Sequence, residues 1–144
     1  MSTIKSMAVA VLLTLVSCFP AQSESEIPLF DQSGDPVAYI ATDEELTIYM
    51  WGGKPAAYLY EDNVYGFNGK HLGWFDEGII WDHEGRIAGF LKGAVRVYTH
   101  YEPYKGYKEY KPYKSYKEYA PYRPAKNQAW SPTPLALLLL SGAS

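Results

Sequence analysis

Cysteine, histidine and long apolar runs are scarce in this chain of 144 residues. Cys18 is the only cysteine, so an internal disulfide framework is excluded. The apolar run Ala8–Val16 is about half the ~20 residues that span a bilayer, so we expect no permanent membrane helix. A phosphate-binding loop, a Gly-x-Ser-x-Gly elbow and a His-Glu-x-x-His helix are also missing. These absences argue against the common enzyme classes, and we expect no catalytic residue, cofactor or bound metal.

Residues 1–23 have the features of a secretory signal peptide. A positive residue, Lys5, precedes a short apolar run, and Pro20–Ser23 supplies a break and small residues for cleavage. Cys18 ends a stretch that resembles a bacterial lipobox, so lipidation at this cysteine is the alternative route of processing. We therefore expect a secreted, periplasmic or cell-envelope protein, with a lipid anchor on Cys18 as the alternative.

Charge is divided unevenly along the chain. Residues 24–98 hold 13 acidic and 5 basic side chains, whereas residues 99–126 hold 3 acidic and 7 basic ones. A basic tail on an acidic domain favours contact with an anionic surface. That surface is an anionic envelope polymer, a polysaccharide or the chain's own acidic domain. Nucleic acid is not expected, because the tail holds most of the cations and no nucleic-acid motif is present.

One short phrase occurs four times between residues 29 and 91. The copies are LFDQSGDPVAYI, IYMWGGKPAAYL, VYGFNGKHLGWF and IWDHEGRIAGFL, anchored on Gly34, Gly53, Gly69 and Gly85. Each glycine is followed, four and five residues later, by a small residue and then an aromatic one: Ala38-Tyr39, Ala57-Tyr58, Gly73-Trp74 and Gly89-Phe90. A repeat with fixed internal chemistry predicts one small supersecondary unit built four times.

Each copy is typical of two short strands joined by a turn. Gly52-Gly53 and Asn68-Gly69 predict two-residue hairpin turns, while Asp31–Gly34 and Asp82–Gly85 predict four-residue turns. β-branched and aromatic residues dominate the arms, and no helical period occurs between residues 24 and 98. We predict an all-β domain over residues 24–98, with four hairpins in pseudo-fourfold arrangement, most aromatics in a central core, and the small residues where strands approach closely.

These phrases, above all Val64–Phe75, resemble the bacterial "4-fold beta flower" domain proteins over residues 27–95. The resemblance implies four hairpins about a pseudo-fourfold axis and implies no enzymatic activity. The first copy departs from the pattern, because the acidic insertion Thr42–Glu45 precedes the second copy. Weak calcium binding by this insertion is a minor alternative to a solvated acidic loop.

A second period begins at Tyr98, where tyrosine recurs at every third residue as far as Tyr122. Lysine or arginine follows many of these tyrosines, and the prolines exclude a regular helix. A three-residue period matches polyproline II geometry, with tyrosines on one edge and cations on another. Residues 99–128 are therefore predicted to be extended or disordered. Three roles remain open: a solvated stalk, an adhesive or docking strip, and a site of oxidative tyrosine crosslinking.

The C-terminal segment, residues 129–144, contains the apolar run Leu135–Leu140. Six apolar residues are too few to cross a membrane, and left exposed they would promote aggregation. We expect this run to return to the domain as an added strand or a plug, which would pin the tyrosine segment at both ends. Contact with a membrane surface is the alternative.

Exposed aromatic side chains are the strongest candidates for binding. The predicted contact residues are Trp51, Trp74, Trp81, Tyr104, Tyr107, Tyr110, Tyr113, Tyr116 and Tyr119. We interpret the chain as a non-enzymatic scaffold with a stalk or adhesive strip, or alternatively as a carbohydrate- or peptide-binding module. A small hydrolase or metal-dependent enzyme around His83 is a weaker hypothesis, because Asp82 and Glu84 beside it are explained by turn chemistry.

Overall fold

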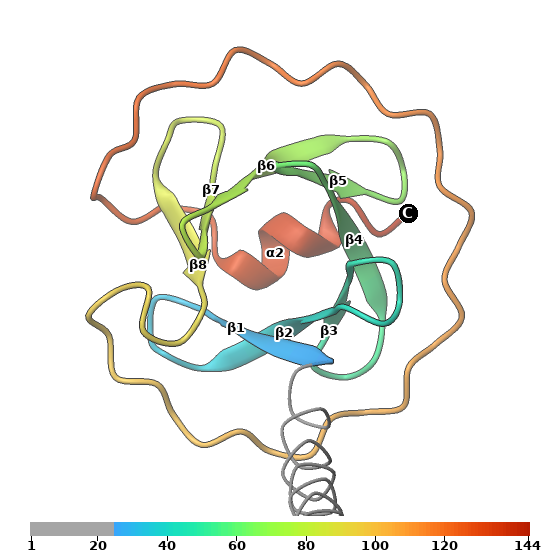
Figure 1. Cartoon of the computed structure of the whole chain (residues 1–144), viewed down its shortest axis with the longest axis horizontal. Coiled ribbons are helices and arrows are strands. Elements are labelled where there is room, and N and C mark those ends of the chain that lie inside the picture. The colour runs from blue at the N-terminus through green and yellow to red at the C-terminus, as the bar shows by residue number, and fades with distance from the viewer. Residues whose placement is uncertain (1–24) are drawn as a thin grey trace, which may run out of the picture.

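The computed structural model describes residues 25–144, in which eight antiparallel strands close into a barrel (Figure 1). The strands are β1 (Glu26–Phe30), β2 (Pro36–Ala41), β3 (Thr47–Met50), β4 (Pro55–Tyr60), β5 (Asn63–Gly66), β6 (His71–Asp76), β7 (Ile79–Trp81) and β8 (Ile87–Phe90). Each strand pairs with the next, and β1 closes the ring on β8. The prediction of four hairpins in an all-β domain is confirmed. The predicted signal peptide and Cys18 lie outside the described residues.

All four hairpins turn in the same way. In each, the glycine amide donates to the carbonyl three residues earlier: Gly34 to Asp31, Gly53 to Met50, Gly69 to Gly66 and Gly85 to Asp82. The glycines have φ values between 78° and 106°, and each hairpin has a register shift beside its turn. A four-residue turn closed by a left-handed glycine and a bulge explains these features. The predicted two-residue turns at Gly52-Gly53 and Asn68-Gly69 were therefore wrong.

The barrel interior is filled by pairing a large side chain with a small residue across each hairpin. The pairs are Leu29 with Ala38, Ile48 with Ala57, Val64 with Gly73, and Ile80 with Gly89. The large members are all completely buried. A narrow barrel has room for one bulky side chain of each such pair. The small residue four after each turn glycine thus belongs to the core, and at Gly73 a Cβ would also collide with the Trp81 carbonyl.

Because the four repeats share one geometry, an aromatic pair also lies on the outside of the barrel at each junction between hairpins. Side chains alternate along a strand, so the residue next to an inward Ala or Gly points outward. The cross-strand partners are Phe30 with Phe90, Tyr39 with Tyr49, Tyr58 with Tyr65, and Trp74 with Trp81. All eight side chains are at least 95% buried. The expectation that most aromatics are buried is confirmed, but their central position was wrong, because these eight lie outside the barrel wall, most of them in core clusters of their own.

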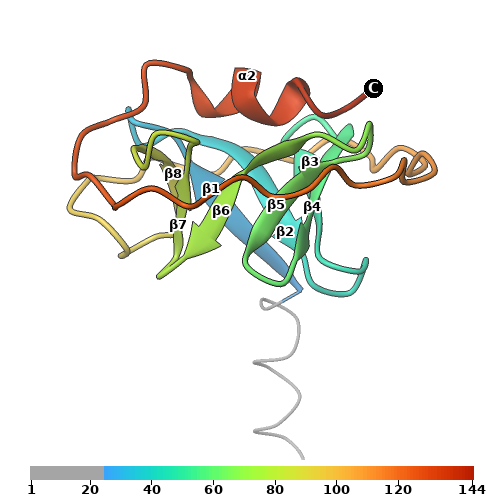
Figure 2. The same ribbon diagram turned by 90° about the horizontal axis from the view of Figure 1, so that it is seen from above.

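Helix α2 (Leu135–Leu140) lies across one end of the barrel (Figures 1 and 2). Leu135 and Leu139 are buried in the same core as the inward side chains of the strands. The chain then passes so close to β5 that the backbone of Gly142 leaves no room for a side chain at Gly66. The apolar run therefore covers the barrel end as a helix and adds no strand to the sheet.

Residues 98–127, here called the belt, run around the outside of the barrel (Figures 1 and 2). The belt contains no helix or strand. It follows the barrel wall and does not extend away from the domain as a stalk would. It begins beside the turn between β1 and β2 and ends beside the turn between β7 and β8, so its two ends lie on the same side of the barrel. Within residues 25–144, no helix is both long enough and apolar enough to cross a membrane.

Two glycines offer a matched test of the close approach between β5 and the C-terminal segment. In the Gly66→Ala variant the new methyl group meets the Gly142 backbone, so we expect a loss of about 1–3 kcal/mol in the free energy of unfolding. The control is Gly52→Ala, where the added methyl group has nothing within 4 Å. Urea unfolding of both variants measures the difference. Equal stability of the two would contradict the packing described here.

Candidate functional site

The belt meets the four hairpins with a spacing of nine residues. The carbonyls of Tyr98, Tyr107, Tyr116 and Ala125 sit directly against the turn glycines 34, 53, 69 and 85, where any side chain would collide with them. Nine residues of belt thus correspond to one hairpin, which is a quarter-turn of the barrel. Belt and barrel therefore share one fourfold register.

Backbone hydrogen bonds hold this register. The amides of His100, Glu109, Glu118 and Asn127 donate to the carbonyls of Gly34, Gly53, Gly69 and Gly85 over 2.8 to 3.0 Å. A second set joins Gly106 to Trp51 and Ser115 to Phe67, both over 2.9 Å. The next position in this set is Pro124, which has no N–H to donate. These main-chain bonds hold the belt in place without using its side chains, although position 106 must be glycine because a Cβ there would meet the Gly52 carbonyl.

Cationic side chains of the belt point inward and cover the outer aromatic pairs. Lys105 and Lys108 lie over Tyr39 and Tyr49, Lys114 over Tyr58, Lys117 over Tyr60, Arg123 over Trp74 and Lys126 over Trp81. The distances from the charged group to the ring centre run from 4.4 Å for Lys114 over Tyr58 to 5.9 Å for Lys108 over Tyr39. Each such contact contributes about 0.5–1 kcal/mol when partly exposed. Three of the four junctions thus carry cations over aromatic rings.

The fourth junction is covered by apolar side chains. The rings of Phe30 and Phe90 stack 5.8 Å apart, and Trp130 packs edge-on against Phe90 at 5.9 Å. Val95 and Val97, just before the belt, complete the cover. This junction lies between the two ends of the belt, so apolar contacts cover the part of the barrel wall that the belt leaves open.

Acidic residues of the barrel pair with the same belt cations. Glu26 binds Lys108 at 2.8 Å and Lys105 at 3.3 Å, and Asp76 binds Lys126 at 2.6 Å and Arg123 at 3.0 Å. Burial alone would raise the pKa of Glu26, but the hydrogen bonds from its two lysines hold it below the ordinary value. The hydrogen bond from Lys126 likewise lowers the pKa of Asp76.

The insertion Thr42–Glu45 takes part in the same attraction, since Lys111 binds Glu45 at 3.1 Å and lies 3.7 Å from Glu44. The basic belt therefore meets the acidic barrel that precedes it.

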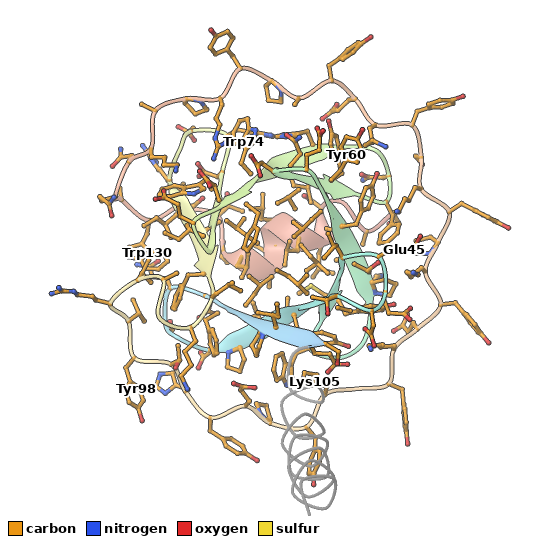
Figure 3. All side chains as sticks on the ribbon, in the orientation of Figure 1. Glu45, Tyr60, Trp74, Tyr98, Lys105 and Trp130 are labelled. Atoms are coloured by element: carbon orange, nitrogen blue, oxygen red, sulfur yellow. The ribbon has the colours of Figure 1, made fainter. Side chains whose placement is uncertain are left out.

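The tyrosines of the belt all point away from the barrel (Figure 3). Tyr98 and Tyr101 are 81% exposed, and the seven from Tyr104 to Tyr122 are between 97% and 102% exposed. In contrast, Tyr39, Tyr49, Tyr58 and Tyr65 lie beneath the belt, and burial raises their pKa values, to about 12 for Tyr39. The fold thus separates a fully exposed set of phenols from a buried set.

The three predicted tryptophan contacts are held under the belt. Trp74 and Trp81 are 4% and 3% exposed, so neither is a free platform. Trp51 is partly exposed and donates from its indole nitrogen to the Pro103 carbonyl at 3.0 Å. Trp81 borders a hollow that it shares with Arg96 and Lys126. Of the predicted contact residues, the six tyrosines from Tyr104 to Tyr119 are the ones presented to solvent.

A histidine pair lies between two hairpins. The Nδ1 atom of buried His71 is 2.9 Å from Nε2 of exposed His83, and its Nε2 is 2.9 Å from the Asn63 side-chain oxygen. The Asn63 oxygen can only accept, so His71 donates through Nε2 and accepts from His83 through Nδ1. Burial, followed by the nearby His83, lowers the pKa of His71 to about 4. The backbone N–H of His71 also donates to the carboxylate of Glu118 in the belt, at 2.7 Å.

The carboxylate of Asp82, next to His83, stabilises the turn. Asp82 accepts hydrogen bonds from the amides of Glu84 and Arg86, as Asp31 does from Ser33 and Asp35 in the first hairpin. His100, the third histidine, packs its ring against Tyr98. Among residues 25–144, His, Cys, Asp and Glu form no group of three that could hold a metal ion.

The nine-residue unit of the belt is visible in the sequence, although the three-residue tyrosine period hides it. The segments 98–106, 107–115 and 116–124 read YTHYEPYKG, YKEYKPYKS and YKEYAPYRP, with proline at the sixth position of each. The sequence did not predict the aromatic layer beneath the belt, because apolar and polar residues alternate irregularly along the strands. The inward small residues at Ala38 and Ala57 are the signal that places their neighbours Tyr39 and Tyr58 on the outer face.

The described chain is thus a closed barrel of four hairpins encircled by its own C-terminal segment. The sequence profile of the 4-fold beta flower protein family matches residues 27–139, and the chain belongs to this family. The match extends well past the 27–95 of the sequence resemblance and includes the belt and most of α2. Comparison with curated proteins and with solved structures gives no match.

Lys114 carries a cation–ring contact without an ion pair within 4 Å among the described residues: its ammonium lies over Tyr58, and its charge reaches Glu45 only as a longer-range attraction. We expect Lys114→Met to lower the free energy of unfolding by about 0.5–1 kcal/mol, since it keeps the aliphatic length and removes the charge. Lys92→Met, at an exposed loop residue, is the control. Urea unfolding followed by tryptophan fluorescence gives the comparison. If both variants match the parent, the charge on Lys114 contributes nothing.

The free energy of unfolding should decrease as the pH is lowered, because His71 is buried in its neutral form. Its folded pKa of about 4 lies below the ordinary 6.5, so the unfolded chain binds the proton more tightly. The neutral imidazole therefore contributes up to about 3 kcal/mol to the free energy of unfolding. This contribution is complete above pH 6.5 and is lost as the pH falls from 6.5 to 4.

Urea unfolding of the parent and of His71→Gln at pH 7.5, 5.5 and 4.5 checks this contribution. The difference between the two should shrink as the pH falls, whereas carboxylates such as Asp76 affect both proteins equally. Parallel curves across this range would show that His71 is not the group that titrates.

Proposed function

We propose that this protein is a non-enzymatic display scaffold that presents its belt tyrosines as a multivalent contact surface. The barrel holds the belt, and the belt cations are turned inward onto barrel rings and carboxylates. Among the large apolar side chains of the belt, the tyrosines are the ones open to a partner, and seven of them are at least 97% exposed. That exposure is the single observation that carries the proposal, because these side chains contribute no packing to the fold.

The tyrosines diverge, and this determines the kind of partner that fits. Nine residues of belt cover a quarter of the circle around the barrel and contain three tyrosines. Neighbouring tyrosines therefore differ in direction by about one-twelfth of a full turn. A single straight ligand touches only a few of them at once. Several polymer chains, or several surfaces around one molecule, can each engage a different sector. The geometry therefore favours a node between partners over a pocket for one ligand.

Polysaccharide is the partner whose chemistry fits best. Tyrosine combines an apolar face, which stacks on a sugar ring, with a hydroxyl that hydrogen-bonds at its edge. The features of residues 1–23 support placement in the cell envelope or outside the cell, where such polymers occur. The enzyme hypothesis has less support, since His83 is hydrogen-bonded to His71 and the Asp82 carboxylate accepts a hydrogen bond from a backbone amide of its own turn.

The test is a pull-down on insoluble cellulose, chitin and peptidoglycan. Replacing Tyr104, Tyr107, Tyr110, Tyr113, Tyr116 and Tyr119 together by serine should weaken binding by at least about tenfold, because several weak contacts act together. The fold should persist, since these side chains are exposed, and urea unfolding verifies it.

The matched control carries phenylalanine at the same six positions and should keep most of the binding. Unchanged binding by the serine variant would rule out the belt as the contact surface.

A further inference from the structure

We infer that the exposed belt tyrosines are sites of oxidative coupling that join separate copies of this chain through dityrosine bonds. The inference rests on the outward display proposed above, but it needs no polysaccharide. It assigns the belt a covalent chemistry in addition to a binding surface. The oxidant is hydrogen peroxide, used by a haem peroxidase outside the chain.

Exposure selects which of the 14 tyrosines react. The belt supplies nine, all at least 81% exposed, and Tyr60 is 47% exposed. The remaining four, Tyr39, Tyr49, Tyr58 and Tyr65, are at most 5% exposed beneath the belt. A phenoxyl radical formed on the belt can meet another ring in solution, whereas the buried rings are shielded by the belt that covers them.

The geometry directs the bond between molecules. Belt tyrosines point in successive directions around the barrel, and no two of their rings are in contact within the described structure (Figure 3). The belt backbone is fixed to the hairpins every nine residues, which restrains neighbouring tyrosines from turning toward each other. Another copy can approach the same tyrosine from outside without such restraint.

The reaction balances without any group from this chain beyond the two phenols. Each tyrosine loses one electron and its phenolic proton to give a phenoxyl radical. Two radicals join through their ortho carbons, and the proton on each of those carbons moves to the phenolic oxygen to restore the ring. Hydrogen peroxide accepts the two electrons and two protons, its O–O bond breaks, and two waters form.

The test treats the full chain with a haem peroxidase and hydrogen peroxide. We expect covalent dimers and larger species on a denaturing gel, blue dityrosine fluorescence, and a yield that rises with protein concentration. Peptide mass spectrometry should place the linked residues in the belt. The matched control replaces all nine belt tyrosines by phenylalanine, which keeps the ring and removes the phenol, and this variant should remain monomeric.

The outcomes separate this inference from the proposed function. A chain that stays monomeric, couples only within itself, or couples through Tyr60 or the buried tyrosines overturns the inference. Covalent multimers of the phenylalanine variant overturn it as well. Polysaccharide binding by that variant is measured separately. Its persistence supports the display proposal even where coupling fails, and its loss leaves the coupling result untouched.

Discussion

Belt and barrel share one register, and this shared register determines where every side chain of the belt lies. Nine residues of extended chain span about 28 Å at the polyproline rise, and this length carries the belt from one hairpin turn to the next. Because nine is a multiple of three, the tyrosines keep facing outward while the chain advances by whole hairpins. Turn glycines 34, 53, 69 and 85 make this possible by letting the belt carbonyls lie directly on the turns.

A narrow barrel explains why the belt is needed at all. The interior accepts only one bulky side chain per hairpin pair, as between Ile80 and Gly89, so eight aromatic residues are placed on the outer wall. Left uncovered, that wall would be a continuous apolar surface of the kind that soluble monomers avoid. The belt covers it with lysine stems and charged groups, which contact rings on one side and water on the other. The domain thus has two layers of burial, one inside the barrel wall and one outside it.

Local patterns predicted the four hairpins better than they predicted the belt. The glycine and aromatic spacing around Gly69 defines a hairpin without any knowledge of its neighbours, and four copies define the symmetry. The net charges of the two segments also indicated attraction between them. Which ring each lysine covers depends on contacts far apart in sequence, such as Lys114 with Tyr58, and no local pattern specifies that pairing. The histidine pair is hidden for the same reason, since His71 and His83 come from different hairpins.

The match between belt and hairpins also limits how this segment can change in length over evolution. Loss of three residues keeps every tyrosine outward but moves the remaining lysines off their rings. Loss of nine, which is 27 nucleotides of coding sequence, restores the pairing but leaves one hairpin uncovered and takes α2 a quarter-turn away from its seat over Gly89. Any change in the number of repeats in the belt would therefore disturb its contacts with the four hairpin turns.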